Sequence, residues 1–333
     1  MSIVDYLHAW YALILHWVFQ IQHRQVGHLT KDRQTGVYVR EIRPLNEQLY
    51  RLVIWNRWME WLDLSRWWRL HLHHITTTAG RDMLHPETKM QIPGFVKFFK
   101  VKMEDFEPSD LDKFHNFDEF FVRRLRPGAR PIAEAEDDTL AVIPSDCRAV
   151  FFETVAETKK LWIKAREFTI AQLIEDEKAA LTWAEGRVGS FRLSLQDYHH
   201  YHSPVSGKVA WWKSIPGETY GVDPLAINSD VDVLGRNERT AVCIDSAEFG
   251  KVLFVAIGAQ DVGSCNLTPT VEEHGVLKKG DEIGWFQFGG SSIVVAFEKE
   301  RITFDEDLLD VSYRGIEMDV QMGQSMGRAT QKM

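Results

Sequence analysis

The sequence predicts an α+β protein, in which an N-terminal helical region is followed by a β-rich, mainly antiparallel domain. Three observations predict this class. Aromatic and apolar residues recur at helical spacing up to residue 75, five prolines then interrupt the chain between residues 86 and 131, and short apolar runs bounded by turn residues follow. With 333 residues, 44% of them apolar, the chain is long enough to bury a sizeable core. We expect residues 1–90 to form the helical region and residues 91–333 the β-rich domain.

Two N-terminal segments, residues 3–21 and 47–75, are rich in tryptophan, and seven of the twelve tryptophans lie in the first 68 residues. In the second segment they are interleaved with four basic residues, Arg51, Arg57, Arg66 and Arg69. Tryptophan and arginine on one helix suit a water–lipid boundary, where the indole is half buried and the guanidinium meets phosphate. Packing against the rest of the protein explains the same pattern, so membrane docking and internal packing both stay open. The segment 3–21 carries Asp5, His8 and His16 and no basic flank, so we expect neither a signal peptide nor a membrane span.

Composition argues against several classes of function. The net charge of −9, from 39 basic and 48 acidic side chains, argues against a nucleic-acid binder. The three cysteines are widely spaced and predict neither a disulfide framework nor a zinc site, which fits a reducing compartment. His71, His73 and His74 have no carboxylate or cysteine at ligand spacing, so we expect no metal ion there. The N-terminus has no arginine-rich, acid-poor presequence, and we expect an intracellular protein, cytoplasmic or peripheral on a membrane, with the organelle open.

Beyond residue 132 the pattern predicts eight strands and one helix. The strands are expected at 140–143, 149–152, 191–195, 208–212, 239–244, 251–257, 283–288 and 293–297, and the helix at 170–184. Just before them, the run from Phe117 to Ile132 predicts a helix, a basic turn and an extended segment. Its four arginines could meet an anionic headgroup, but the default for such a charge run is a solvated face paired with Asp118 and Glu119.

The last two predicted strands are joined by Gly289, Gly290, Ser291 and Ser292, which interrupt an apolar pattern. Consecutive glycines inside a strand mark a bulge or a close approach to the backbone, and a bulge between core strands is the ordinary explanation. The alternative is chemical. Ser291 attacks the carbonyl of Gly290, the peptide becomes an ester, and β-elimination with loss of ammonia leaves a pyruvoyl group at residue 291. Such a serine needs a nearby base to become a nucleophile.

Two places in the predicted β-rich domain could supply that base. The stretch from Gln196 to Pro204 carries three histidines, His199, His200 and His202, and histidine is the side chain best suited to move protons near neutral pH. Asp146 follows the strand expected at 140–143. An aspartate there caps a turn, or it orients a histidine in a Ser-His-Asp arrangement.

With these segments in order, the chain resembles the phosphatidylserine decarboxylases, a pyruvoyl-dependent, self-cleaving family, in the Gly-Gly-Ser-Ser form of its processing motif. The resemblance covers roughly residues 90–330. It rests on the run from Phe117 to Ile132, the Pro-Ser-Asp at Asp146, the motif Asp197-Tyr198-His199-x-x-His202-x-Pro204, Val262-Gly263-Ser264, Gly280 to Gly284, Gly289 to Ser292, and the tail segments 304–308 and 322–327. So many motifs in order outweigh the ordinary turn explanations of Gly290-Ser291 and Asp146.

The resemblance implies cleavage between Gly290 and Ser291. The products would be a β chain of residues 1–290 and an α chain of residues 291–333, whose first residue is a pyruvoyl group made from Ser291.

Roles for three further residues are implied by the same resemblance. Asp146 and His202 would act with Ser291 in self-cleavage as a Ser-His-Asp set. His199 would act in decarboxylation, by positioning the substrate carboxylate or by handling the proton delivered to Cα. His200 is a departure, because many members carry a different basic residue there, and it is left out of the set.

The implied activity is conversion of phosphatidylserine to phosphatidylethanolamine and CO2 at a membrane surface, and homodimers are common in the family. The intact Asp197-Tyr198-His199 form and the tryptophan-rich N-terminal segments favour the phospholipid. Decarboxylation of a soluble aromatic amino acid such as tryptophan stays open, because the chain is acidic and has no clear membrane anchor. A silent lipid-binding homologue is a third interpretation, and the presence of all the implied catalytic residues argues against it.

Overall fold

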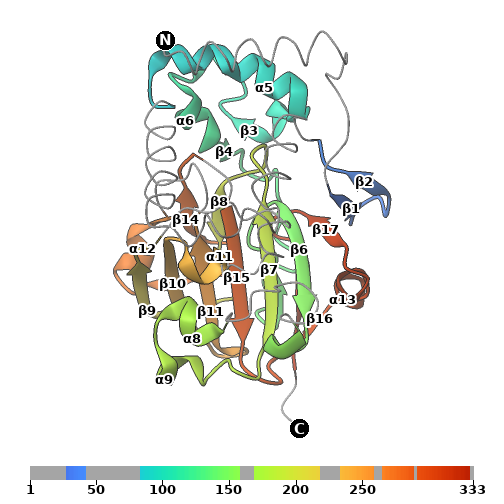
Figure 1. The fold of residues 1–333 in the computed structure, drawn as a ribbon, viewed down its shortest axis with the longest axis vertical. Helices are drawn as coiled ribbons and strands as arrows, with labels where there is room; N and C mark the ends of the chain where they lie inside the picture. Colours follow the sequence, from blue (N-terminus) through green and yellow to red (C-terminus); the bar gives the residue numbers. More distant parts are fainter. Residues whose placement is uncertain are drawn as a thin grey trace, which may run out of the picture.

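The computed structural model describes residues 28–42, 83–157, 169–217, 233–258, 265–288 and 291–330. Their centre is a ten-stranded sheet (Figure 1). Its strands, in spatial order, are β13 (Val276–Leu277), β9 (Gly207–Ile215), β10 (Arg239–Ser246), β11 (Gly250–Ile257), β15 (Ser291–Phe297), β7 (Arg187–Leu193), β6 (Cys147–Phe152), β17 (Glu317–Val320), β1 (Leu29–Asp32) and β2 (Tyr38–Arg40). Neighbouring strands are antiparallel except β1 and β17, which are parallel. The predicted α+β class with mainly antiparallel strands is confirmed.

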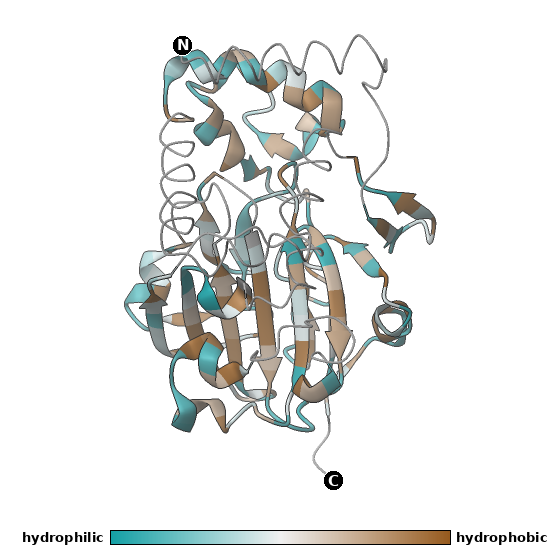
Figure 2. Ribbon diagram, viewed as in Figure 1, coloured by the Kyte–Doolittle hydropathy of each residue, from teal (hydrophilic) through white to brown (hydrophobic). Residues whose placement is uncertain are grey.

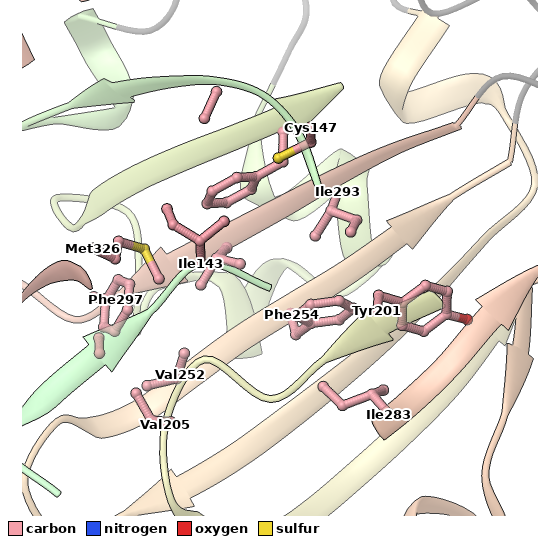
Figure 3. Packing of buried hydrophobic residues seen from close by; sticks show 14 of the residues in the cluster. Ile143, Cys147, Tyr201, Val205, Val252, Phe254, Ile283, Ile293, Phe297 and Met326 are labelled. Carbon is pink, nitrogen blue, oxygen red and sulfur yellow. The ribbon is translucent and has the colours of Figure 1, made fainter. Parts of the chain in front are cut away.

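Smaller sheets add to the β structure of the described residues. The first contains β12 (Cys265–Leu267), β14 (Glu282–Phe286) and β8 (His200–His202), the second β16 (Ile302–Phe304), β18 (Ser325–Ala329) and β5 (Leu140–Val142), and a short ribbon pairs β3 (Phe106–Glu107) with β4 (Arg124–Leu125). The two three-stranded sheets cover one face of the large sheet. Tyr201 and Ile283 lie in one apolar cluster with Phe254 and Ile293 of the large sheet (Figure 3).

The opposite face of the large sheet is covered by short helices, among them α8 (Ile170–Ile174), α9 (Glu177–Ala180) and α11 (Val233–Arg236) (Figure 1). Side chains alternate along a strand, so β15 sends Ile293 and Val295 into one core and Val294 and Ala296 into the other. Burial on both faces explains why this strand reads as a continuous apolar run, visible as brown ribbon in Figure 2.

The single helix expected at 170–184 is wrong, because α8 and α9 are separate helices. The break lies at Glu175, whose φ of 49° is left-handed and ends the first helix. Asp176 then starts the second, since its side chain accepts the N–H of Ala179 at 2.9 Å. An N-cap aspartate inside an apolar helical pattern was the overlooked sequence feature.

Most of the region expected to be helical, residues 1–90, lies outside the described residues, including both tryptophan-rich segments and the histidines His71, His73 and His74. Within it, β1 and β2 form a hairpin rather than a helix. Asp32 builds the turn, because one of its carboxylate oxygens accepts both the N–H of Thr35 at 2.7 Å and its hydroxyl at 2.9 Å. Gly36 follows with a φ of 69°.

A helical cap lies at one end of the large sheet (Figure 1). It contains η1 (Pro86–Gln91), α5 (Ile92–Phe99), η2 (Met103–Asp105), η3 (Leu111–Lys113) and α6 (Phe117–Phe121). Phenylalanines of α5 and α6 form its core, with Phe95 and Phe120 at 5.7 Å between ring centroids. The other described helices are α12 (Pro269–Glu272) and α13 (Glu306–Tyr313). None of the helices in the described part of the chain has the length and apolar character needed to span a bilayer.

Candidate active site

The candidate self-cleaving serine opens the strand at the middle of the large sheet. β15 begins at Ser291 and lies between β11 and β7, where Ser291 pairs with Leu193. The next side chain, Ser292, is fully buried. The segment 289–290 and the side chain of Ser291 lie outside the described residues. The predicted scissile bond is therefore located by its two flanks, Phe288 before it and the Leu193 pairing after it.

The histidine motif runs beside the strand that leads to this serine. β14 pairs with β8 in antiparallel fashion, with Glu282 opposite His202. Further along, the N–H of Phe286 donates to the carbonyl of His199 at 2.9 Å. The segment that leads to Ser291 therefore lies beside His202 at its start, at Glu282, and beside His199 at its end, at Phe286.

His199 lies close to the segment that precedes the predicted scissile bond. Its ring packs on Phe121 of α6 with 3.8 Å between centroids, and Phe121 in turn contacts Phe288 at 5.1 Å. The carbonyl of Asp197 accepts a hydrogen bond from Nδ1 of His199 at 3.0 Å. Because that carbonyl only accepts, Nδ1 carries a proton, and Nε2 is the basic nitrogen of the neutral ring.

His202 is held in its neutral form. Its Nδ1 donates to the carbonyl of Gly280 at 2.9 Å, and its Nε2 accepts from the hydroxyl of Tyr198 at 3.1 Å. Burial lowers the pKa of His202, and this effect outweighs the hydrogen bond to Gly280, which raises it. A neutral imidazole is the form that accepts a proton, so its protonation state suits a general base.

Asp146 binds an arginine rather than a histidine. Arg130 contacts both carboxylate oxygens, with Nη2 at 2.8 Å from Oδ2 and Nε at 3.1 Å from Oδ1. The N–H of Met322 also donates to Oδ1 at 2.9 Å. His202 lies near, since its own N–H donates to the carbonyl of Pro144 at 2.8 Å, but the described contacts of the two side chains do not join them. Asp146 acts on His202 through space, where its charge raises the pKa of the imidazole.

His200 is bound at both ring nitrogens by acceptors. Nδ1 lies 3.0 Å from Oε1 of Glu282, and Nε2 lies 2.9 Å from the carbonyl of Val122. Arg124 binds the other oxygen of Glu282 at 2.9 Å. Burial raises the pKa of Glu282, but the hydrogen bond and charge interaction with His200 and the charge of Arg124 together oppose this, and the pKa of Glu282 is lowered.

Comparisons with known proteins show which family this chain is similar to. Residues 117–328 match the family model described as phosphatidylserine decarboxylase. A phosphatidylserine decarboxylase proenzyme of Chlamydia caviae is 37% identical over 242 residues, which are 73% of this chain and 79% of that protein. This chain belongs to the phosphatidylserine decarboxylase family. The matched region contains all the catalytic residues implied by the resemblance, and the family predicted from the sequence is confirmed.

Longer members of the family are also similar to this chain. Phosphatidylserine decarboxylase proenzyme 2 of Komagataella phaffii is 38% identical over 307 residues, 91% of this chain and 30% of that protein. Proenzyme 2 of Oryza sativa subsp. japonica is 43% identical over 261 residues, 78% of this chain and 42% of that protein. The chain therefore spans less than half the length of these two decarboxylase proenzymes.

The arginine run of this family member is only in part the solvated face that the sequence predicts, because Arg124 and Arg126 are exposed and Arg123 and Arg130 are not. Arg123 is 2% exposed and donates to the carbonyls of Gln196 and Asp197, at 2.5 and 3.1 Å. Burial lowers its pKa to about 10. Arg130, also largely buried, binds Asp146 and Asp105. The expected pairing with Asp118 and Glu119 is wrong, because Arg123, Arg124 and Arg130 bind other segments instead.

A buried charge cluster, which sequence reasoning missed, lies beside the serine strand of this decarboxylase homologue. Its members are Glu41, Arg148, Arg192, Asp197, Glu317 and Asp319. Arg192 donates to Glu317 at 2.8 and 2.5 Å and to Glu41 at 2.8 Å. Arg148 pairs with Asp197, with Glu41 at 3.1 Å and with Asp319 at 3.5 Å.

The cluster contains four carboxylates and two guanidiniums, and one of the carboxylates, Asp197, has a strongly raised pKa. Burial raises the pKa of Asp197 to about 6, against the opposing effect of Arg148. One of its oxygens accepts the N–H of Ser194 at 2.7 Å. Ser194 follows Leu193, the partner of Ser291, so the cluster is tied to the serine strand through one residue.

Proposed function

We propose that this chain is a pyruvoyl-dependent decarboxylase that converts phosphatidylserine to phosphatidylethanolamine and CO2 after cleaving itself between Gly290 and Ser291. One observation carries the proposal. The family match extends across a serine that opens a central strand, and the neighbouring segment holds a neutral histidine, His202, and a second histidine, His199, whose ring packs on Phe121 as Phe288 does. Because the carboxylate of the substrate lies in a lipid headgroup, we propose that the protein acts peripherally on a membrane.

In the proposed self-cleavage, Nε2 of His202 accepts the hydroxyl proton of Ser291 in place of the hydrogen bond from Tyr198, and Asp146 stabilises the resulting imidazolium through space. The serine oxygen bonds to the carbonyl carbon of Gly290, the C–N bond breaks, and the released amine takes up the proton to leave an ester. Removal of the Cα proton of residue 291 then breaks its Cβ–O bond and frees Gly290 as a carboxylate. The nitrogen of residue 291 is then lost as ammonia when water adds to its Cα. This leaves the pyruvoyl group at the N-terminus of the α chain.

The surroundings of residue 291 fit such a group. β15 keeps its ladders to β7 and β11 after the preceding bond is cut, so the new N-terminus stays anchored. Phe288 lies three residues before it in the sequence and contacts the ring of Phe121 at 5.1 Å, and these apolar rings would help to exclude water from the group. A pyruvoyl group supplies an electron sink for an amine-bearing substrate.

The remaining work in decarboxylation falls to side chains of the protein. We propose that His199, whose basic nitrogen is Nε2, handles the proton that replaces CO2 at Cα. Its stacking on Phe121 and the hydrogen bond of Nδ1 to Asp197 fix the ring orientation. The apolar walls favour conversion of the charged carboxylate to neutral CO2.

The test is the intact mass of the purified protein under denaturing conditions, beside a Ser291→Ala variant. We expect the wild type to give two chains, 1–290 and 291–333, the smaller blocked at its N-terminus, and the variant to give one chain of 38.6 kDa. The cleaved protein is then assayed on liposomes containing phosphatidylserine and on free tryptophan. An uncut wild type refutes the proposal, and activity on tryptophan alone refutes the substrate.

A further inference from the structure

Helix α6 contacts both the histidine implied in decarboxylation and the segment that leads to the scissile bond. Phe121 packs on His199, and Phe121 and Phe117 both contact the ring of Phe288, at 5.1 and 5.5 Å between centroids. These contacts form one apolar wall at the end of β14. The orientation of α6 therefore bears on two parts of the site at once.

A buried carboxylate on the same helix reaches the backbone of that segment. Asp118 is 8% exposed, and its Oδ1 accepts the N–H of Phe288 at 3.3 Å. Burial raises the pKa of the Asp118 carboxyl, and the hydrogen bond from Phe288 opposes that rise. No basic side chain of the described residues forms an ion pair with it. A buried carboxylate is costly, and here its described compensation is a backbone N–H two residues before Gly290.

The helix itself is fixed, so its carboxylate has a defined place. Asn116 caps α6 by accepting the N–H of Glu119 at 2.8 Å, and the N–H of Asp118 donates to the carbonyl of Met83 at 3.3 Å. The chain beyond the scissile bond is fixed as well, because Ser291 pairs with Leu193. Only Gly289 and Gly290 connect the anchored Phe288 to this pairing.

We propose that Asp118 is a positioning residue for self-cleavage, because it anchors the backbone of Phe288, two residues before the proposed cleavage site. The inference rests on the proposed function. Glycine is the residue type with the widest choice of backbone conformations, so a fixed residue close to a glycine pair is a plain way to limit that choice. A displacement of about 1 Å in an attacking geometry costs on the order of 100-fold in rate. Loss of the anchor slows cleavage, while an uncharged acceptor of the same shape preserves it.

Three variants of the full chain test this role, with the time course of cleavage followed by gel after synthesis in a cell-free system. Asp118→Ala removes the acceptor, and we expect cleavage to slow by roughly 10- to 100-fold. Asp118→Asn keeps an oxygen at the same position, and we expect a rate within about threefold of wild type. Glu119→Ala is the matched control on the same helix, since its carboxylate is 45% exposed and binds His115 instead. We expect it to cleave like the wild type.

Melting temperatures separate positioning from folding. The same substitutions are made in the uncut Ser291→Ala chain, and we expect Asp118→Ala to stay folded at the cleavage temperature. The inference is overturned if Asp118→Ala cleaves at the wild-type rate, if Asp118→Asn is as slow as Asp118→Ala, if Glu119→Ala is equally slow, or if Asp118→Ala is unfolded. A wild type that never cleaves refutes the proposed function itself, and the inference with it.

Discussion

The buried charge cluster makes the stability of this protein depend on pH in an unusual direction, and Asp197→Asn tests it. Four carboxylates share two guanidiniums in the cluster, and burial raises the pKa of Asp197 from 3.8 to about 6 in the folded chain. Folding therefore favours the protonated acid. The stabilisation from this group is fully present below about pH 4 and is lost as the pH rises through about 6.

The magnitude follows from the two pKa values. For one acid with a pKa near 6 when folded and near 3.8 when unfolded, the free energy of unfolding falls by about 1.3 kcal/mol between about pH 5 and about pH 7. The Asp197 side chain is 11% exposed, so solvent screening reduces this little. Burial lowers the pKa of His202, which favours folding as the pH rises and has the opposite sign. Both chains in the comparison contain His202, so its effect cancels in the difference.

The assay is urea unfolding at the two pH values, with Asp197→Asn made in the Ser291→Ala chain so that each protein is uncut. Asparagine keeps an acceptor for the N–H of Ser194 and cannot titrate. We expect the parent chain to lose about 1.3 kcal/mol more than the variant between the lower and higher pH. Equal losses, or a larger loss in the variant, would refute the reasoning. A uniform offset between the two chains reports the lost ion pair with Arg148 and leaves the pH argument untouched.

Two further predictions follow from the contacts of the site. Gly284→Ala would place a Cβ 1.9 Å from the carbonyl oxygen of Asn266, and we expect the free energy of unfolding to fall by about 3 kcal/mol or more. Gly94→Ala is the control, because its Cβ would meet no described atom within 4 Å. We expect its free energy of unfolding to rise by up to about 1 kcal/mol in the same urea measurement. A similar fall in both variants would contradict the close-packing argument. Tyr198→Phe removes the donor to Nε2 of neutral His202, so the pKa of His202 rises and the acid limb of the self-cleavage pH profile should move to higher pH. An acid limb that stays in place, or moves to lower pH, would show that the hydroxyl does not hold His202 neutral.

Six of the ten strands of the large sheet, β6, β7, β9, β10, β11 and β15, were predicted from apolar runs, which are longest where both faces of a strand are buried. The segment Ile293–Phe297 contains five apolar residues in a row, and both of its faces are buried. The pairing between distant segments was not predictable in the same way. β17 lies between β6 and the β1–β2 hairpin, far from its neighbours in the sequence, and no periodicity encodes that order.

The site divides in a similar way. The Gly-Ser stretch and the histidine motif are local patterns, and together with the family resemblance they predict roles for His199, His202 and Ser291, which stay predictions. The contacts that support them connect distant residues, as in the bond from Arg192 to Glu41, which spans 151 positions. The bond from Phe288 to Asp118 spans 170 positions. A charged residue in a single sequence looks solvated by default, and only the fold places it inside.

The central place of β15 has a consequence for the lifetime of the proposed enzyme. The segment 291–330 supplies β15 between β11 and β7, β17 between β6 and β1, and β18 between β16 and β5. An enzyme with a diffusible cofactor can discard a damaged molecule and take up a fresh one. Here the reactive group would be the first residue of a strand that cannot leave without opening two sheets. Each molecule would therefore have one cofactor for life, and replacing a spoiled group would require synthesis of a new protein.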